Sequence, residues 1–153
     1  MGPRSFWEKV VGNDAGAIDF YAPDFEQRLG AKPNIGLATP ADYFTGSLGQ
    51  RVQHIVPNYD AAPAELISAI EQAMMALPNI ELAKKDMAAG TLRFIRFSPT
   101  IGFPDTINVQ LVERANGQTS FLALARARVG YSDLGMNAKL LGQLIAAVNK
   151  ATA

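Results

Sequence analysis

The chain has 153 residues, of which 48% are hydrophobic, and it carries 14 basic and 14 acidic residues but no cysteine. This composition is that of one globular domain, and it excludes a disordered chain, disulfide bonds, cysteine nucleophiles and thiolate metal sites. A net charge of zero gives the whole molecule no attraction for nucleic acid, and no apolar run approaches the ~20 residues that span a bilayer.

Residues 1–45 differ in character from the rest of the chain. The stretch 19–44 mixes aromatic residues with proline, glycine and aspartate, and it shows no sustained period of 2 or 3.6. This pattern predicts an irregular, aromatic-rich N-terminal arm rather than a second domain. The residues expected to anchor it by packing are Phe20, Tyr21, Phe25, Tyr43 and Phe44. Residues 46–153 are expected to form a single α+β domain.

The domain is expected to begin with a strand and a helix. A β-branched run predicts a strand over 51–57, which ends at Pro57. A helix is expected over 60–78, because Pro63 suits a first turn and Pro78 stops the helix. Its buried stripe at helical spacing consists of Leu66, Ile70, Met74 and Leu77.

Four strands and a second helix complete the predicted domain. The strands are expected over 80–86, 91–98, 105–114 and 119–129. Asn116 and Gly117 predict a hairpin turn between the last two strands. A final helix is expected over 132–150. The order β-α-β-β-β-β-α predicts an antiparallel sheet of about five strands with both helices on one face, as in helix-grip or TATA-binding-protein-like folds.

The strand over 119–129 carries two arginines near its end. Arg126 and Arg128 alternate with alanines, so their guanidinium groups are expected on one face of the sheet, roughly 7 Å apart. The opposite face is rich in alanine, which suits a helix that lies close against the strand. Two guanidinium groups at this spacing need an acidic partner, an anionic ligand or solvent.

The residues that follow this strand have a structural and a functional interpretation. Structurally, Ser132 or Asp133 can cap the last helix, which is worth on the order of 1 kcal/mol. Asn137 shares a helix face with Asp133, and an Arg128–Asp133 ion pair would fix this helix to the sheet. Functionally, paired arginines beside a helix N-terminus form a binding site for a carboxylate or a phosphate. The members of such a ligand site would be Arg126, Arg128, Tyr131, Ser132, Asp133 and Asn137. We favour the structural joint, because internal ion pairs often resemble sites.

Three segments of the chain carry a resemblance to a known family. The arginine-rich strand continues into Gly-x-Ser-Asp-x-Gly-x-Asn within 126–137, residues 102–105 read Gly-Phe-Pro-Asp, and residues 32–34 read Lys-Pro-Asn. Over roughly residues 30–150, the chain resembles the domain-of-unknown-function family 1499. The resemblance implies a protein of the cell envelope that faces the periplasm, with membrane association only through an upstream anchor. The N-terminus itself shows no hydrophobic signal core.

The sequence shows no recognisable catalytic or metal-binding set. His54 is the only histidine, which leaves no ligand cluster for a metal and no Ser-His-Asp arrangement. We expect His54 to be partly buried and hydrogen-bonded. Because glycine-rich phosphate motifs and paired catalytic carboxylates are also absent, we expect neither a cofactor nor an enzymatic activity.

Two classes of function remain open. The first is a non-catalytic module of the cell envelope that binds a small or lipidic anionic ligand. The second is an accessory or assembly protein that docks a partner protein through a basic sheet face or through the N-terminal arm. The basic face is expected because residues 91–153 carry seven basic and three acidic residues. Neither class involves nucleic acid.

Overall fold

The computed structural model describes residues 17–99, 102–128 and 132–153. The strands in these ranges are β1 (Ile35–Thr39), β2 (His54–Ile55), β3 (Ile80–Asp86), β4 (Thr91–Phe97), β5 (Pro104–Glu113) and β6 (Thr119–Ala127). The helices are α2 (Phe25–Leu29), α3 (Gly46–Gly49), α4 (Pro63–Met75) and α5 (Met136–Ala151), and a short 3-10 turn, η1, covers Ala115–Gly117.

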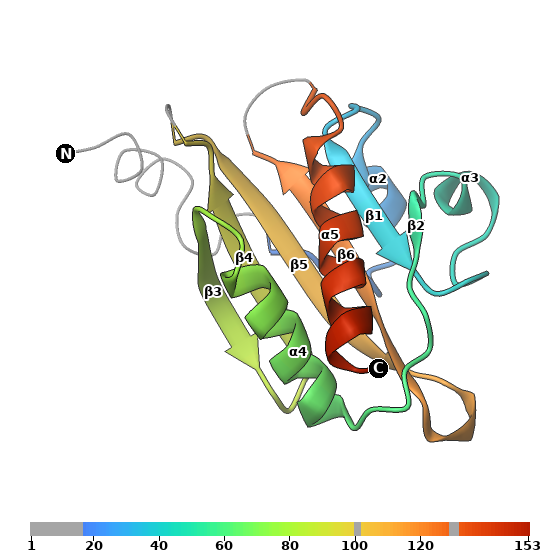
Figure 1. Ribbon diagram of the computed structural model, residues 1–153. Helices are drawn as coiled ribbons and strands as arrows, with labels where there is room; N and C mark the ends of the chain where they lie inside the picture. Colours follow the sequence, from blue (N-terminus) through green and yellow to red (C-terminus); the bar gives the residue numbers. More distant parts are fainter. Residues whose placement is uncertain (1–16, 100–101, 129–131) are drawn as a thin grey trace.

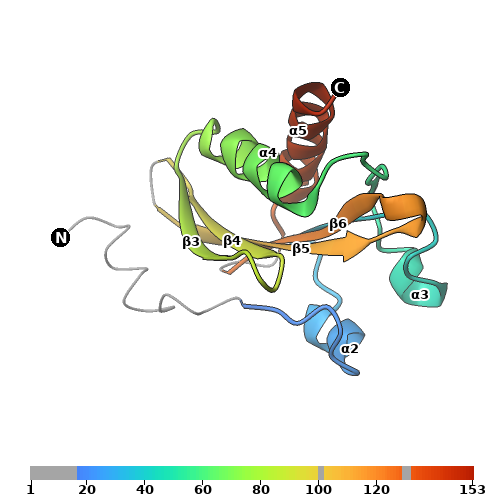
Figure 2. The ribbon, with the colours of Figure 1, turned by 90° about the horizontal axis from the view of Figure 1, so that it is seen from below.

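The strands of the described residues form one mixed sheet in the order β2-β1-β6-β5-β4-β3 (Figure 1). The pairs are antiparallel except for β1 and β2, which run parallel. Helices α4 and α5 lie together on one face of the sheet, whereas α2 lies on the other (Figure 2). In this part of the chain, every helix falls short of the length and apolarity that crossing a bilayer requires.

The predicted α+β class is confirmed, but the predicted sheet needs two corrections. The described part of the chain forms six strands rather than about five, and the β1–β2 pair is parallel. The additional strand, β1, lies inside residues 1–45, so this stretch is not irregular throughout. All of its residues are buried, so it lacks the alternation by which a half-buried strand is recognised. The likeness to helix-grip and TATA-binding-protein-like folds and the division at residue 45 stay predictions.

The main core lies between the sheet and the two long helices. In α4, the predicted stripe is confirmed, since Leu66, Ile70 and Met74 are buried in this core and Leu77 packs against it. Helix α5 contributes Leu140, Leu141, Leu144, Ile145 and Val148. Each fully buried side chain of this size contributes roughly 1.5–3 kcal/mol to folding. The alanine face of β6 is the surface that α5 covers, as predicted, with Ala123 and Ala125 in the same core.

Helix α5 crosses β1 at Gly36 with backbone against backbone. A Cβ atom at Gly36 would lie 2.7 Å from the carbonyl carbon and oxygen of Asn137 and 2.8 Å from the amide nitrogen of Ala138. Only glycine leaves room for this approach. The first turn of α5 is therefore held directly on the sheet.

The opposite face of the sheet is covered by the N-terminal arm. The ring centroids of Phe20 and Phe25 are 5.4 Å apart, and those of Phe25 and Phe44 are 5.6 Å apart. Tyr43 meets Phe44 edge to face, so aromatic anchoring is confirmed for these four residues. Tyr21 is an exception, because 59% of it is exposed. The sheet contributes Ile35, Leu37, Val112, Leu122 and Leu124 to this second core.

The contact at Gly36 predicts a large effect of a single added methyl group. Gly36→Ala is expected to lower the free energy of unfolding by roughly 1–3 kcal/mol or more. The added methyl group would meet the backbone of α5, so the whole helix would have to shift away from the sheet. Gly142→Ala is the matched control, since the three atoms nearest to its Cβ would belong to the side chain of His54, with Cε1 at 3.1 Å, and not to backbone, and alanine favours helix. Urea unfolding measures both, and equal losses would contradict the backbone contact.

Tyr59 predicts a pH dependence of stability. The residue is buried, its hydroxyl donates to Asn149 Oδ1 at 2.6 Å, and its ring stacks on Phe121. Burial raises the pKa of Tyr59 from 10.0 to about 12, so folding favours the neutral phenol. The stability that follows from this shift is present below pH 10 and is lost as the pH rises through about 12. An ultraviolet phenolate titration should show a late transition that Tyr59→Phe lacks; if the variant keeps it, the assignment is wrong.

Candidate functional site

The three segments that carry the family resemblance meet at one end of the sheet (Figure 1). The backbone amide of Arg128 donates to the carbonyl of Pro104 at 3.1 Å, and the amide of Asp133 approaches the carbonyl of Pro33 at 3.4 Å. These contacts join the end of β6 and the approach to α5 with segments 32–34 and 102–105. Residues that are about 100 positions apart in the sequence therefore build one common region.

Asn137 and Asn34 form the buried joint of this region. Asn137 is completely buried in the first turn of α5, and its Nδ2 donates to the carbonyl of Asn34 at 3.4 Å. Asn34 Nδ2 donates in turn to the carbonyl of Ala127 at 3.3 Å. Because these bonds connect α5, the start of β1 and the end of β6, Asn137 has a structural role and opens to neither cavity described below.

The two predicted arginines lie on the face of the sheet away from α4 and α5. Arg126 Nη1 donates to the carbonyl of Arg28 in α2 at 2.8 Å, which fixes the direction of its side chain. Arg126, Arg128 and Lys32 line a cavity of about 370 Å³, which we call the arginine cavity. Its other walls come from Leu29, Gly30, Ala31, Asn34 and Ala127.

The surroundings of Arg126 and Arg128 in this cavity disfavour their positively charged forms. Among the described residues, no carboxylate forms an ion pair with Arg126 or Arg128. Burial lowers the pKa of Arg128, and burial together with the charge of Arg128 lowers the pKa of Arg126. Two half-buried guanidinium groups thus line one cavity, and no carboxylate among the described residues compensates their charge.

Asp133 accepts a hydrogen bond from the first turn of α5, as predicted, although the N-cap residue is Gly135, and it does not pair with Arg128. Its carboxylate accepts hydrogen bonds from the amides of Gly135 at 2.8 Å and Asn137 at 3.3 Å. Arg128 lies on the face of the sheet that α5 does not cover, because it alternates with the alanines beneath the helix. The predicted Arg128–Asp133 ion pair is therefore wrong, and the close backbone contact at Gly36 takes its place in holding α5.

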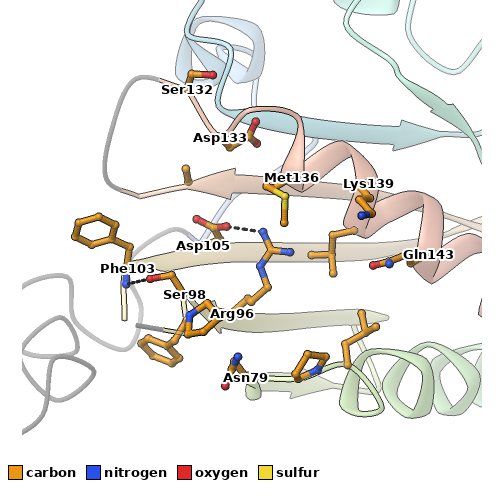
Figure 3. Close-up of a pocket in the computed structure, with 16 residues that line it drawn as sticks. Asn79, Arg96, Ser98, Phe103, Asp105, Ser132, Asp133, Met136, Lys139 and Gln143 are labelled. Atoms are coloured by element: carbon orange, nitrogen blue, oxygen red, sulfur yellow. Dashed lines mark hydrogen bonds and ion pairs between the residues drawn. The ribbon is translucent and has the colours of Figure 1, made fainter. Parts of the chain in front are cut away.

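A second cavity of about 470 Å³ opens on the helix side of the same end of the sheet (Figure 3). It lies between the end of α4, strands β4 and β5, and the start of α5, and we call it the helix-side cavity. Arg96 and Asp105 face each other across β4 and β5 and form an ion pair of 2.8 Å, with each side chain 18% exposed. Ser132 and Asp133 open to this cavity rather than to the arginine cavity.

The carboxyl group of Asp105 is held in an unfavourable environment despite its partner. Burial raises the pKa of Asp105, and the charge of Asp133 raises it further, while the hydrogen bond from Arg96 acts in the opposite direction. The net direction is upward, because removing a carboxylate from water disfavours its charged form.

The single site predicted from the sequence is thus divided between two cavities. Arg126 and Arg128 line one, Ser132 and Asp133 line the other, and Asn137 is buried between them. Tyr131 lies outside the described residues. The sequence interpretation missed the contributions of three residues, which are Lys32, Arg96 and Asp105. For two of them the sequence does carry a signal. Arg96 lies two residues after Phe94, and Asp105 lies two residues before Ile107, so strand alternation puts both charged side chains on the face of the sheet that carries the core.

His54 has the structural role expected of it. Its Nε2 lies 2.7 Å from the carbonyl oxygen of Ala138, and its ring packs over Gly142 of α5. In the described part of the chain, no three histidine, aspartate or glutamate side chains gather in a way that could hold a metal ion. The two cavities at this end of the sheet therefore contain no group of described residues that could hold a metal ion.

A family model with the description "Protein of unknown function (DUF1499)" matches residues 35–148. The chain belongs to this family. The predicted resemblance is therefore confirmed, and the match contains two of the three segments that meet at the end of the sheet. The segment 32–34 directly precedes it. A search of the curated proteins found no match. In this DUF1499 domain, the segments that carry the family resemblance also contribute residues to both cavities.

The division of the site predicts that removing the charge of Asp133 destabilises the domain and that removing the charge of Arg128 does not. Asp133→Ala should lower the free energy of unfolding by about 0.5–2 kcal/mol, because the first turn of α5 loses a cap. Arg128→Ala should change it by less than about 0.5 kcal/mol, since no ion pair is broken. Thermal and urea unfolding compare the variants. A loss at Arg128 as large as that at Asp133 would instead support an ion pair.

Proposed function

We propose that this DUF1499 domain is a non-catalytic binding module that holds a small anionic ligand in the arginine cavity. One observation carries the proposal: Arg126 and Arg128 are half-buried side by side, with Lys32 in the same cavity and no ion-pairing carboxylate among the described residues. A bound anion would supply the missing charge.

The geometry favours an anion with several oxygen atoms. Guanidinium groups bind carboxylate and phosphate oxygens through paired N–H donors, and such charged hydrogen bonds are shorter and stronger than neutral ones. The bond from Arg126 to the Arg28 carbonyl uses one donor of that side chain, which orients the remaining donors in advance. Among the described residues that line the cavity, the titratable side chains are Lys32, Arg126 and Arg128, so these residues offer positive charge and no carboxylate base.

The origin of the anion is part of the proposal. A free phosphate and the headgroup of an anionic lipid present the same oxygens, and the envelope location implied by the family resemblance makes a lipid headgroup one source. Docking of a partner protein through a basic face or the N-terminal arm stays a prediction. The cavity favours the ligand, because it is a concave space of small-molecule size.

The arginine cavity predicts a specific loss of anion binding. Isothermal titration at low salt should show binding of inorganic phosphate or glycerol phosphate, and Arg128→Gln should weaken it by about tenfold or more, as expected for a lost charged hydrogen bond. Lys150→Gln is the control, because it removes an exposed cation from the last turn of α5. Vesicles with and without anionic lipid then distinguish a headgroup from a free ion.

Two results would contradict this proposal. One is the absence of binding heat with the unchanged protein for every anion. The other is equal weakening by Arg128→Gln and Lys150→Gln, which would show a general effect of net charge rather than a cavity. Raising the salt concentration should weaken binding in the unchanged protein, since ions screen partly exposed charges.

A further inference from the structure

We propose that the helix-side cavity is a second binding site, which takes a small uncharged molecule with an apolar body and a hydrogen-bonding head group. This inference does not rest on the anion site. The two cavities lie on opposite faces of the sheet, and among their lining residues they share Ala127. The argument for the second site uses shape, apolar lining and charge balance.

The walls of the helix-side cavity are largely apolar. They include Leu77 beyond α4, Phe97 in β4, Phe103 before β5, and Met136 and Leu140 in α5. Phe103 is 37% exposed and Met136 is 49% exposed, so two large apolar side chains at this cavity meet water. Covering them with an apolar ligand would be favourable, at roughly 25 cal/mol per Å² removed from water. The volume of about 470 Å³ suits such a molecule.

The charged groups of this cavity balance one another. Its cations are Arg96 and Lys139, and its anions are Asp105 and Asp133. Arg96 is paired with Asp105, and the carboxylate of Asp133 is bound to the backbone at the start of α5. The helix-side cavity therefore lacks the uncompensated charge of the arginine cavity, and an ion would gain little from entering it while losing its hydration.

The floor of the cavity selects the head group. Among the described residues, the Arg96 side chain donates one hydrogen bond, from Nη2 to Asp105 Oδ2, although a guanidinium carries five N–H donors. Asp105 retains acceptor capacity at its second oxygen. Figure 3 shows this pair joined by a dashed line, and Met136 lines the same cavity. A group that both accepts and donates, such as a primary amide or an alcohol, would complement the two side chains together.

Methionine methyl groups provide a direct test of this site. Met136 lines the cavity, whereas Met75 and Met87 are outside its lining and are similarly exposed, at 47% and 50% against 49% for Met136. In NMR spectra of protein with isotope-labelled methionine methyl groups, octanamide should shift the Met136 signal and leave those of Met75 and Met87 unchanged. Octanoate and octylammonium, which have the same chain length, should bind at least about tenfold more weakly because the cavity is electrically balanced.

Variants separate this site from general hydrophobic binding and from the anion site. Phe103→Ala should weaken octanamide binding about fivefold or more, because an apolar wall is lost. Tyr21→Ala, which removes an exposed aromatic residue outside the cavity, should have no effect. Arg128→Gln should leave octanamide binding unchanged even where it abolishes phosphate binding. Equal shifts of the three methionine signals, or tighter binding of octanoate than of octanamide, would overturn the inference.

Discussion

The contact between the backbones of α5 and β1 at Gly36 is the constraint on which the functional end of the molecule depends. Because the backbone of α5 leaves no room for a Cβ atom at Gly36, the depth of its first turn above the sheet is fixed by this contact. That depth brings the Asn137 amide to the carbonyl of Asn34 and leaves Asp133 beside the start of β1. A side chain larger than hydrogen at position 36 would lift the helix and separate these groups.

Strand alternation then divides the end of the sheet into two chemical environments. In β6, the alanines that admit α5 face one side, so the arginines between them must face the other. The arginines consequently meet α2 and the N-terminal arm, and the N-terminus of α5 meets Asp105 and the helix-side cavity. One local pattern of small and charged residues thus both seats the helix and produces two separate cavities.

Much of this arrangement could be predicted from local patterns, and the failures have identifiable causes. The alternation in β6 and the helical spacing in α4 involve residues that are close in sequence, so the sequence alone predicts them. Strand β1 was hidden, because burial on both faces removes alternation. The predicted Arg128–Asp133 pair is wrong because strand alternation puts Arg128 on the face of the sheet away from α5, although the two residues are close in sequence. The role of Lys32 depends on a contact between segments far apart in sequence, which periodicity cannot reveal.

The two cavities also differ in how the protein treats buried charge. Arg96 and Asp105 lose hydration together and partly compensate each other, so the helix-side cavity can remain empty without a large electrostatic penalty. Arg126 and Arg128 have no such compensation among the described residues, and burial lowers the pKa of each, so their charged forms are disfavoured. A ligand that binds only the folded protein adds to its stability in proportion to the logarithm of its concentration above the dissociation constant. If the proposed anion binds the arginine cavity, the stability of this domain should therefore rise with the concentration of that anion.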